Sequence, residues 1–141
     1  PELGRQPGTQ VFRSLDEFPD SETYPGLLVL RFDAGLFFTS VDALEDRLRE
    51  LALVADPPLH TIVLDFEGIN FIDSQGSSKL ADTIEMATNY DIELRLTRVK
   101  PHVKDLLQRD GVIDSIGEDH IYGNVYEAAA DQIHDTPLSK L

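Results

Sequence analysis

The sequence predicts an α/β fold in which a mostly parallel sheet of four to five strands is covered by about four helices. Two observations support this: compact apolar segments rich in β-branched residues, and amphipathic segments whose apolar residues recur at steps of three and four. The two kinds of segment alternate along the chain, which implies right-handed crossovers between parallel strands. At 141 residues, the chain suits one domain.

Five segments are expected to form strands, at residues 11–15, 27–32, 61–66, 92–97 and 120–122. The second is an almost unbroken apolar run, typical of a strand covered on both faces. The third is compact and β-branched, and is the clearest strand of the chain. In the fourth, apolar and polar side chains alternate, so we expect one wetter face and a place near a sheet edge. The first two strands, joined by a polar loop, would add an antiparallel edge.

The first two helices are expected on either side of the clearest strand. One begins with Thr39 or Ser40 as its N-cap and ends before the two prolines at 57–58. Its apolar stripe is formed by Val41, Leu44, Leu48 and Leu51. The other runs from about residue 74 to residue 89.

Two further helices are expected towards the carboxyl end. Pro101 suits the first position of a helix, and Gly111 supplies its end. Asn124 is expected to cap the last helix, with Glu127 as its capping-box partner. The buried side of this helix is expected to consist of Tyr126, Ala129, Ala130 and Ile133.

Charge and composition exclude several classes of function. Twelve Lys and Arg face 26 Asp and Glu, giving a formal net charge of −14, which argues against nucleic-acid binding and unassisted docking on an anionic membrane. The absence of cysteine excludes disulfides, thiolate zinc sites and cysteine nucleophiles. No apolar run approaches the ~18 residues of a membrane span. Because the chain begins at Pro1 without an initiator Met, we expect a piece of a longer protein.

The segment at residues 71–76 carries the most chemistry. It links the clearest strand to a helix start, at the strand end where open α/β sheets collect ligands, together with the loops at 33–40 and 97–100. Ser74 would lie among unpaired backbone N–H groups, which favour an anion or an attached phosphate. The alternative is that Asp73 and Ser74 are simple helix caps and that Gly76 allows tight packing.

Residues 62–66 and 71–76 read IVLDF and FIDSQG. This pattern resembles the signature of STAS domains, a family that unites bacterial anti-sigma factor antagonists with the cytoplasmic carboxyl-terminal domains of SulP-type anion permeases. The segments at 3–9, 24–27 and 30–38 read LGRQPGT, YPGL and LRFDAGLFF, and resemble the permease branch. Ser40 departs from that branch, where many domains carry Asn, and the long insert of animal relatives is missing.

The resemblance implies a bacterial, non-enzymatic regulatory domain of an anion transporter, with sulfate as the transported anion. Residues 1–10 would be the lead-in from a preceding membrane domain, 11–135 the STAS domain, and 136–141 a tail. The implied location is the cytoplasmic face of the plasma membrane, and the implied partners are the transmembrane domain and a cytoplasmic regulatory protein. The alternative is a free anti-sigma factor antagonist that is switched by phosphorylation of Ser74.

The resemblance also raises nucleotide binding, because STAS domains have been proposed to bind nucleoside triphosphates. No cofactor is required, but weak binding of GTP or ATP would fall on the rim loops, although the chain has neither a Walker A pattern nor a G-x-G-x-x-G pattern. The candidate nucleotide-binding residues are Asp33, Phe37, Thr39, Ser40, Asp73, Ser74, Gln75, Gly76 and Arg98.

Enzymatic and metal-binding hypotheses find little support in the sequence. The four histidines share no ligand-like spacing, and no base lies near Ser74 in the sequence. Asp33, Asp65 and Asp73 would either hold Mg²⁺ beside a nucleotide or act as solvated caps.

Two further clusters have open interpretations. The local basic group would face phosphates or lipid headgroups, or else lie solvated at a strand edge and helix start; it consists of Arg95, Arg98, Lys100 and Lys104. Exposed rings at Phe37 and Phe38 would mark a docking patch. We expect at least one of these two rings to be buried against the first helix.

Overall fold

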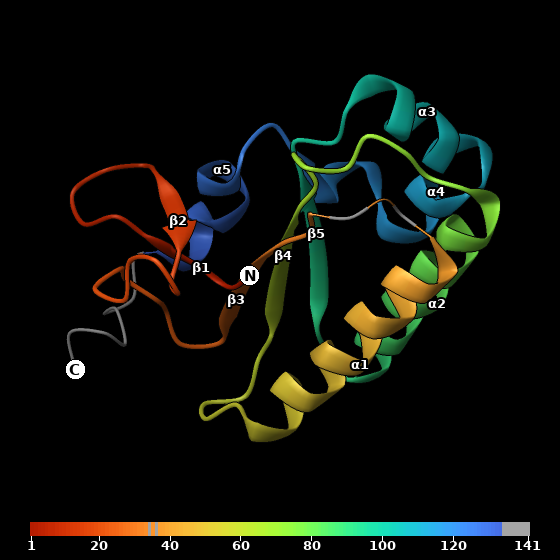
Figure 1. Cartoon of the computed structure of the whole chain (residues 1–141). Helices are drawn as coiled ribbons and strands as arrows, with labels where there is room; N and C mark the ends of the chain where they lie inside the picture. Colours follow the sequence, from red (N-terminus) through yellow and green to blue (C-terminus); the bar gives the residue numbers. More distant parts are fainter. Residues whose placement is uncertain (34, 36, 134–141) are drawn as a thin grey trace.

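The computed structural model describes residues 1–33, 35 and 37–133 of the chain (Figure 1). Its main sheet has four strands, all parallel, in the spatial order β3-β4-β5-β6. The strands are β3 (Leu27–Arg31), β4 (Thr61–Asp65), β5 (Glu93–Thr97) and β6 (Ile121–Tyr122). The predicted α/β class with a mostly parallel sheet is confirmed.

Helices cover both faces of this sheet (Figure 1). One face carries α1 (Phe38–Val54), α2 (Ser74–Asn89), α3 (Pro101–Arg109) and α4 (Val112–Ile116). The opposite face carries α5 (Val125–Ala129) and a separate antiparallel pair, β1 (Leu3–Arg5) with β2 (Phe12–Ser14). Two short 3₁₀ turns, Glu118–His120 and Ala130–Gln132, precede β6 and follow α5. Among the described residues, no helix is both long and apolar enough to cross a bilayer.

Successive residues of β3 and β4 enter two different cores. Leu28, Leu30, Ile62 and Leu64 pack beneath α1 to α4, whereas Leu27, Val29 and Val63 pack against β1 and α5. This division follows from the alternation of side chains along a strand. It explains why residues 27–32 and 61–66 read as almost continuous apolar runs, and it confirms that these strands are covered on both faces.

The amino-terminal part of the chain differs from the expectation. β2 pairs with β1 instead of adding an antiparallel edge to β3. The antiparallel neighbour of β3 is instead Glu2, which bridges to Leu30. The stretch 1–10, expected to be only a lead-in, therefore contributes β1 to the fold, and Leu3 is buried. The expected tail at 136–141 lies outside the described residues.

The fourth strand lies near a sheet edge, as expected, but its expected wetter face is wrong. β5 lies between β4 and the edge strand β6, whose two residues pair with Leu96 and Thr97. The face expected to be wet is covered by α5, and both Arg95 and Thr97 are buried.

The expected cap of α1 and the expected buried side of α5 need correction. The N-cap of α1 is Phe37, and Ser40 lies in the first turn. In α5 the buried residues are Val125, Ala128 and Ala129. Ala130 is exposed and begins the 3₁₀ turn, and Tyr126 is only half-buried, because the helix ends after five residues. The caps Asp73 and Asn124 and the first-turn proline Pro101 are as expected.

Candidate functional site

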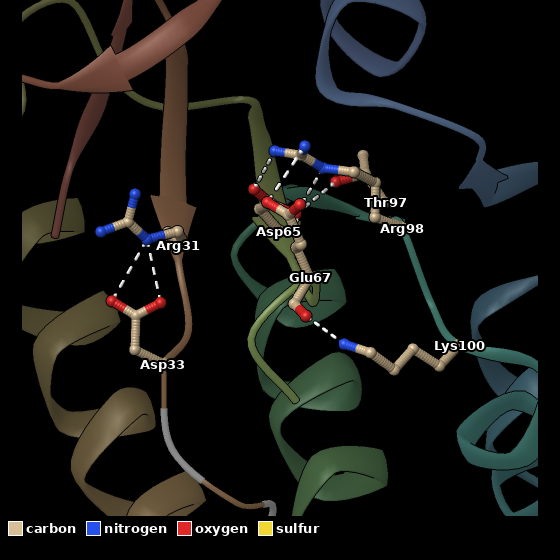
Figure 2. A network of polar contacts seen from close by, with 7 residues as sticks. All are labelled: Arg31, Asp33, Asp65, Glu67, Thr97, Arg98 and Lys100. Atoms are coloured by element: carbon tan, nitrogen blue, oxygen red, sulfur yellow. Dashed lines mark hydrogen bonds and ion pairs between the residues drawn. The ribbon is translucent and has the colours of Figure 1, made fainter. Parts of the chain in front are cut away.

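A buried carboxylate, Asp65, organises the carboxyl end of the sheet (Figure 2). It is the last residue of β4 and is 0% exposed. The guanidinium of Arg98 donates two hydrogen bonds to it, from Nε to Oδ1 at 3.2 Å and from Nη2 to Oδ2 at 2.6 Å. The hydroxyl of Thr97 and the backbone N–H of Glu67 also donate to Oδ1, at 3.3 and 3.1 Å. A buried charge is tolerated only when such partners bind it, so the fold at this end of the sheet depends on the network.

All three guanidinium nitrogens of Arg98 contact carboxylates of this network. Arg98 follows β5 directly with a φ of 52°, a left-handed conformation that is uncommon for a residue with a side chain. The third guanidinium nitrogen, Nη1, forms an ion pair with Glu67 at 3.1 Å. The hydrogen bonds to Asp65 raise the pKa of Arg98 above its ordinary value. A ligand phosphate that used Arg98 would therefore have to compete with two carboxylates.

The four clustered cations of the sequence do not form one basic patch. Arg95 lies on the α5 face, where it binds Asp131. Lys100 donates to the backbone carbonyl of Glu67 (Figure 2) and Lys104 pairs with Glu118 at 2.7 Å. Arg95 and Lys104 are neutralised by carboxylates in different places, and the ammonium of Lys100 is held by backbone carbonyls, which disfavours a joint site for phosphates or lipid headgroups.

The first turn of α2 begins with two exposed residues and is capped by a side chain. The backbone N–H of Gly76 donates to Oδ1 of Asp73 at 2.7 Å, so Asp73 is the cap. Ser74 and Gln75 are exposed at the first two helical positions, where backbone N–H groups have no intrahelical acceptor. Gly76 is buried.

One residue beyond, Ser77 was not singled out by the sequence. Its hydroxyl is fully buried and has no hydrogen-bond partner among the described residues.

The start of α1 lies beside the start of α2. The hydroxyl of Ser40 accepts a hydrogen bond from the backbone N–H of Phe37 at 3.0 Å and lies 2.7 Å from the carbonyl of Gly35, to which it can donate. Thr39 is exposed and caps nothing. The Ser40 hydroxyl therefore holds the loop before α1 in place through these two hydrogen bonds. An Asn side chain at this position would form them with a different geometry.

The expectation that Phe37 or Phe38 is buried is wrong. The two residues are 43% and 48% exposed. Phe37 lies against Phe71, which is itself exposed, with 5.5 Å between ring centroids. Phe38 lies 5.7 Å from the ammonium of Lys79. Contact between Phe37 and Phe71 links two rim loops that are far apart in sequence. Phe71 begins the signature segment, but no role for its ring was predicted from the sequence.

Below this rim, a partly buried ion-pair network joins α1 to α2. Glu45 is 5% exposed and binds Lys79 at 2.9 Å and Arg49 at 2.8 Å, and it accepts from the hydroxyl of Thr83 at 3.1 Å. Lys79 also reaches Asp42 at 3.2 Å. Hydrogen bonds to these two carboxylates raise the pKa of Lys79. The network holds the two helix starts at a set separation beneath the rim.

The three carboxylates considered for magnesium do not converge. Asp33 pairs with Arg31 at 2.9 Å and Asp65 binds Arg98 (Figure 2). Asp73 caps α2. In the described part of the chain, no three His, Cys, Asp or Glu side chains are arranged to hold a metal ion. The rim thus combines exposed aromatic rings, one exposed helix start and internally satisfied charges, an arrangement suited to contact with another molecule.

Comparison with known proteins identifies the family. A profile described as STAS domain matches residues 18–128. The chain belongs to the STAS domain family. Among curated relatives, it is 28% identical over 141 residues to a probable sulfate transporter 4.2 of Arabidopsis thaliana, covering 94% of this chain and 21% of the relative. This STAS domain thus spans about a fifth of the length of that relative.

Solved structures of low identity share the fold. The murine Slc26a9 anion transporter matches with a TM-score of 0.82 at 15% identity, over 95% of this chain and 22% of that one. The SulP transporter STAS domain of Vibrio cholerae matches with a TM-score of 0.66 at 18% identity, over 84% and 90% of the two chains. The phosphorylated Bacillus cell fate determinant SpoIIAA matches with a TM-score of 0.56 at 17% identity, over 77% and 92%.

Proposed function

We propose that this STAS domain is the cytoplasmic regulatory domain of a bacterial SulP-type anion transporter, with sulfate as the transported anion and no enzymatic activity of its own. The observation that carries the proposal is the alignment of 94% of the chain with a fifth of a sulfate transporter. The rim supports a binding role: its buried carboxylate, Asp65, is neutralised by Arg98. The partner proposed first is the transmembrane domain of the same protein.

The full-length protein tests this proposal. We expect it to fractionate with membranes and to restore sulfate uptake in cells that lack their own sulfate transporters. A variant with Lys104→Ala, which breaks only an exposed ion pair, should transport normally. A variant that lacks residues 11–133 should lose regulation or transport. A full-length product recovered only in the soluble fraction would contradict the proposal.

Nucleotide binding is a second, weaker element of the proposal. The exposed N–H groups of Ser74 and Gln75 and the open rings of Phe37 and Phe71 lie at the same rim, and the former favour a phosphate. We expect weak affinity, because Arg98 is held by Asp65 and no loop encloses a phosphate. Titration with millimolar GTP or ATP should shift the amide resonances of Asp33, Thr39, Ser40 and residues 73–76. Shifts confined to the opposite end of the sheet would contradict this placement.

The alternative function is that of a free antagonist switched at Ser74. It is favoured by one observation: Ser74 is an exposed hydroxyl at the first position of α2. In the transporter reading, Ser74→Ala should leave stability unchanged, because Asp73 is the cap, whereas Asp73→Ala should lower it by about 1 kcal/mol. Ser74→Asp should be tolerated near the positive helix end.

Urea unfolding of the three variants and transport by the full-length forms separate the two functions. If Ser74→Asp folds normally yet abolishes transport or partner binding, and a cellular kinase labels Ser74, the serine is a switch. Transport that is the same in Ser74→Asp and in the unmodified protein supports the structural role.

A further inference from the structure

The open edge of β3 already carries the beginning of an added strand. β3 is an edge strand of the main sheet, and the chain start runs antiparallel beside it (Figure 1). Glu2 bridges to Leu30, and the backbone N–H of Arg31 donates to the carbonyl of Pro1 at 2.9 Å. The pairing therefore extends to Pro1, the first residue of the sequence. Residues before Pro1, if they continued this pairing, would run along β3 towards the carboxyl end of that strand.

A groove of about 460 Å³ lies directly ahead of Pro1. It is bounded by the edge of β3 on one side and by α1 on the other, and its lining includes Pro1, Leu30, Phe32, Ala43, Leu44 and Arg47. Most of these are carbon surfaces, and Leu30 and Leu44 belong to the main core. A groove of this kind beside an unpaired strand edge accepts an extended peptide.

The register of the bridge between Glu2 and Leu30 defines which residues before Pro1 would lie opposite which residues after Leu30. With Glu2 opposite Leu30 and Pro1 opposite Arg31, the residue before Pro1 would lie opposite Phe32, and the one before that opposite Asp33. Side chains of opposed residues share a face, so the residue before Pro1 would stand beside Phe32, over the groove. A residue that precedes proline is restricted to extended conformations, which suits continuation of the strand.

The hydrogen bonding agrees with this register. In an antiparallel pair, the bonded positions alternate, and the next bonded position after Arg31 is Asp33. Within the described residues, the backbone N–H of Asp33 has no acceptor. A carbonyl two residues before Pro1 would supply it.

We propose that the segment preceding Pro1 in the full-length protein continues the antiparallel pairing along β3, and that an apolar side chain directly before Pro1 fills the groove between β3 and α1. The proposal rests on the proposed function, since it needs chain before Pro1. The continued strand would connect the last membrane segment to the edge of the sheet and to α1. A displacement of the membrane segment would then pull on β3 along the strand direction.

Two lengths of the protein test the proposal: one that begins at Pro1 and one that begins about a dozen residues earlier in the full-length sequence. The longer form should melt about 3 °C or more higher, and its Asp33 amide should exchange roughly tenfold more slowly. Ala43→Arg, at an exposed groove position, should remove the gain without changing the shorter form. Leu53→Arg, on the same helix but 83% exposed and outside the groove, should leave the gain intact.

Several results would overturn the proposal. They are equal melting and exchange of the two forms, a gain that survives Ala43→Arg, and a charged residue directly before Pro1. A gain that grows with protein concentration would assign the groove to a second copy of the chain instead. These failures would leave the transporter assignment standing if the full-length protein still moves sulfate, so the two proposals fail separately.

Discussion

At the scale of single residues, Asp65 and Arg98 determine how the rim is built. A carboxylate with no solvent exposure is tolerated because four donated hydrogen bonds satisfy it. The left-handed backbone conformation of Arg98 costs free energy, which its pairing with Asp65 offsets. Two of the three rim loops, those after β4 and β5, are thereby tied together through the ion pairs of Arg98 with Asp65 and Glu67.

We predict that Arg98→Ala lowers the free energy of unfolding by about 3–5 kcal/mol, because it leaves Asp65 buried without its cation. The double variant with Asp65→Asn should recover part of this loss, since no charge then remains buried. Lys104→Ala is the matched control: its pair with Glu118 is exposed, and the loss should stay below about 1 kcal/mol. Urea unfolding measures all three, and similar losses for Arg98→Ala and Lys104→Ala would contradict the prediction.

At the scale of elements, Arg95 fastens α5 to the sheet. A helix of five residues is not stable alone, so its position depends on tertiary contacts. The guanidinium of Arg95 donates to the carbonyl of Ala128 at 2.7 Å and to both carboxylate oxygens of Asp131, at 2.6 and 2.9 Å. It also pairs with Glu93 of the same strand. Because α5 covers Val29 and Val63, the burial of these two residues depends on the hydrogen bonds of Arg95.

The Arg95–Asp131 contact predicts a pH dependence of stability. Hydrogen bonding from Arg95 lowers the pKa of Asp131 below its ordinary value of 3.8. Because the folded pKa lies below the unfolded one, the contribution is present above about pH 4 and is lost as the pH falls through the lowered pKa. Asp131→Asn should reduce the free energy of unfolding by about 1 kcal/mol at pH 7, since Asp131 is largely exposed and screened.

The measurement is urea unfolding between pH 7 and pH 2.5. The difference between the unmodified protein and Asp131→Asn should shrink towards zero at the acidic end. Asp105→Asn, an exposed acid on α3, is the control and should not change the acid limb. A constant difference at every pH would show that the loss comes from packing and not from the charge.

At the scale of the whole molecule, the dominant property is charge. The formal net charge is −14, and several of the twelve cations, among them Lys79, Arg95 and Arg98, are engaged in internal ion pairs. Each such pair also occupies at least one acid, so the net excess of acids over cations remains. The proposed partner, the cytoplasmic side of a membrane domain, generally carries an excess of Lys and Arg.

We predict that association of the isolated domain with the membrane part of its transporter weakens as salt rises from about 50 to 500 mM, because screening acts on exposed charges. The measurement is co-sedimentation with proteoliposomes that contain the truncated transporter in neutral lipid. An uncharged osmolyte at equal osmolarity is the control and should have no such effect. Binding that does not change with salt would contradict an electrostatic contact.

The elements with strong local patterns were predicted closely. β4 was expected at 61–66 and spans Thr61–Asp65, and α2 was expected from about 74 to 89 and spans Ser74–Asn89. In both, periodicity and capping chemistry lie within the element itself, so nearby residues are sufficient evidence. The position of the signature loop at the carboxyl end of β4 follows for the same reason, since a parallel sheet brings that end to the rim.

What the sequence by itself determined is the class of fold, the order of its main elements and the family to which the chain belongs. Only the tertiary structure decided that Arg95 is buried, that β1 joins the fold and that Asp65 meets Arg98. The alternation in residues 92–97 is the same for a wet face and for a face covered by α5, and Asp65 and Arg98 are 33 residues apart in sequence. Burial and pairing of polar groups depend on which distant element arrives, and a local pattern carries no record of that.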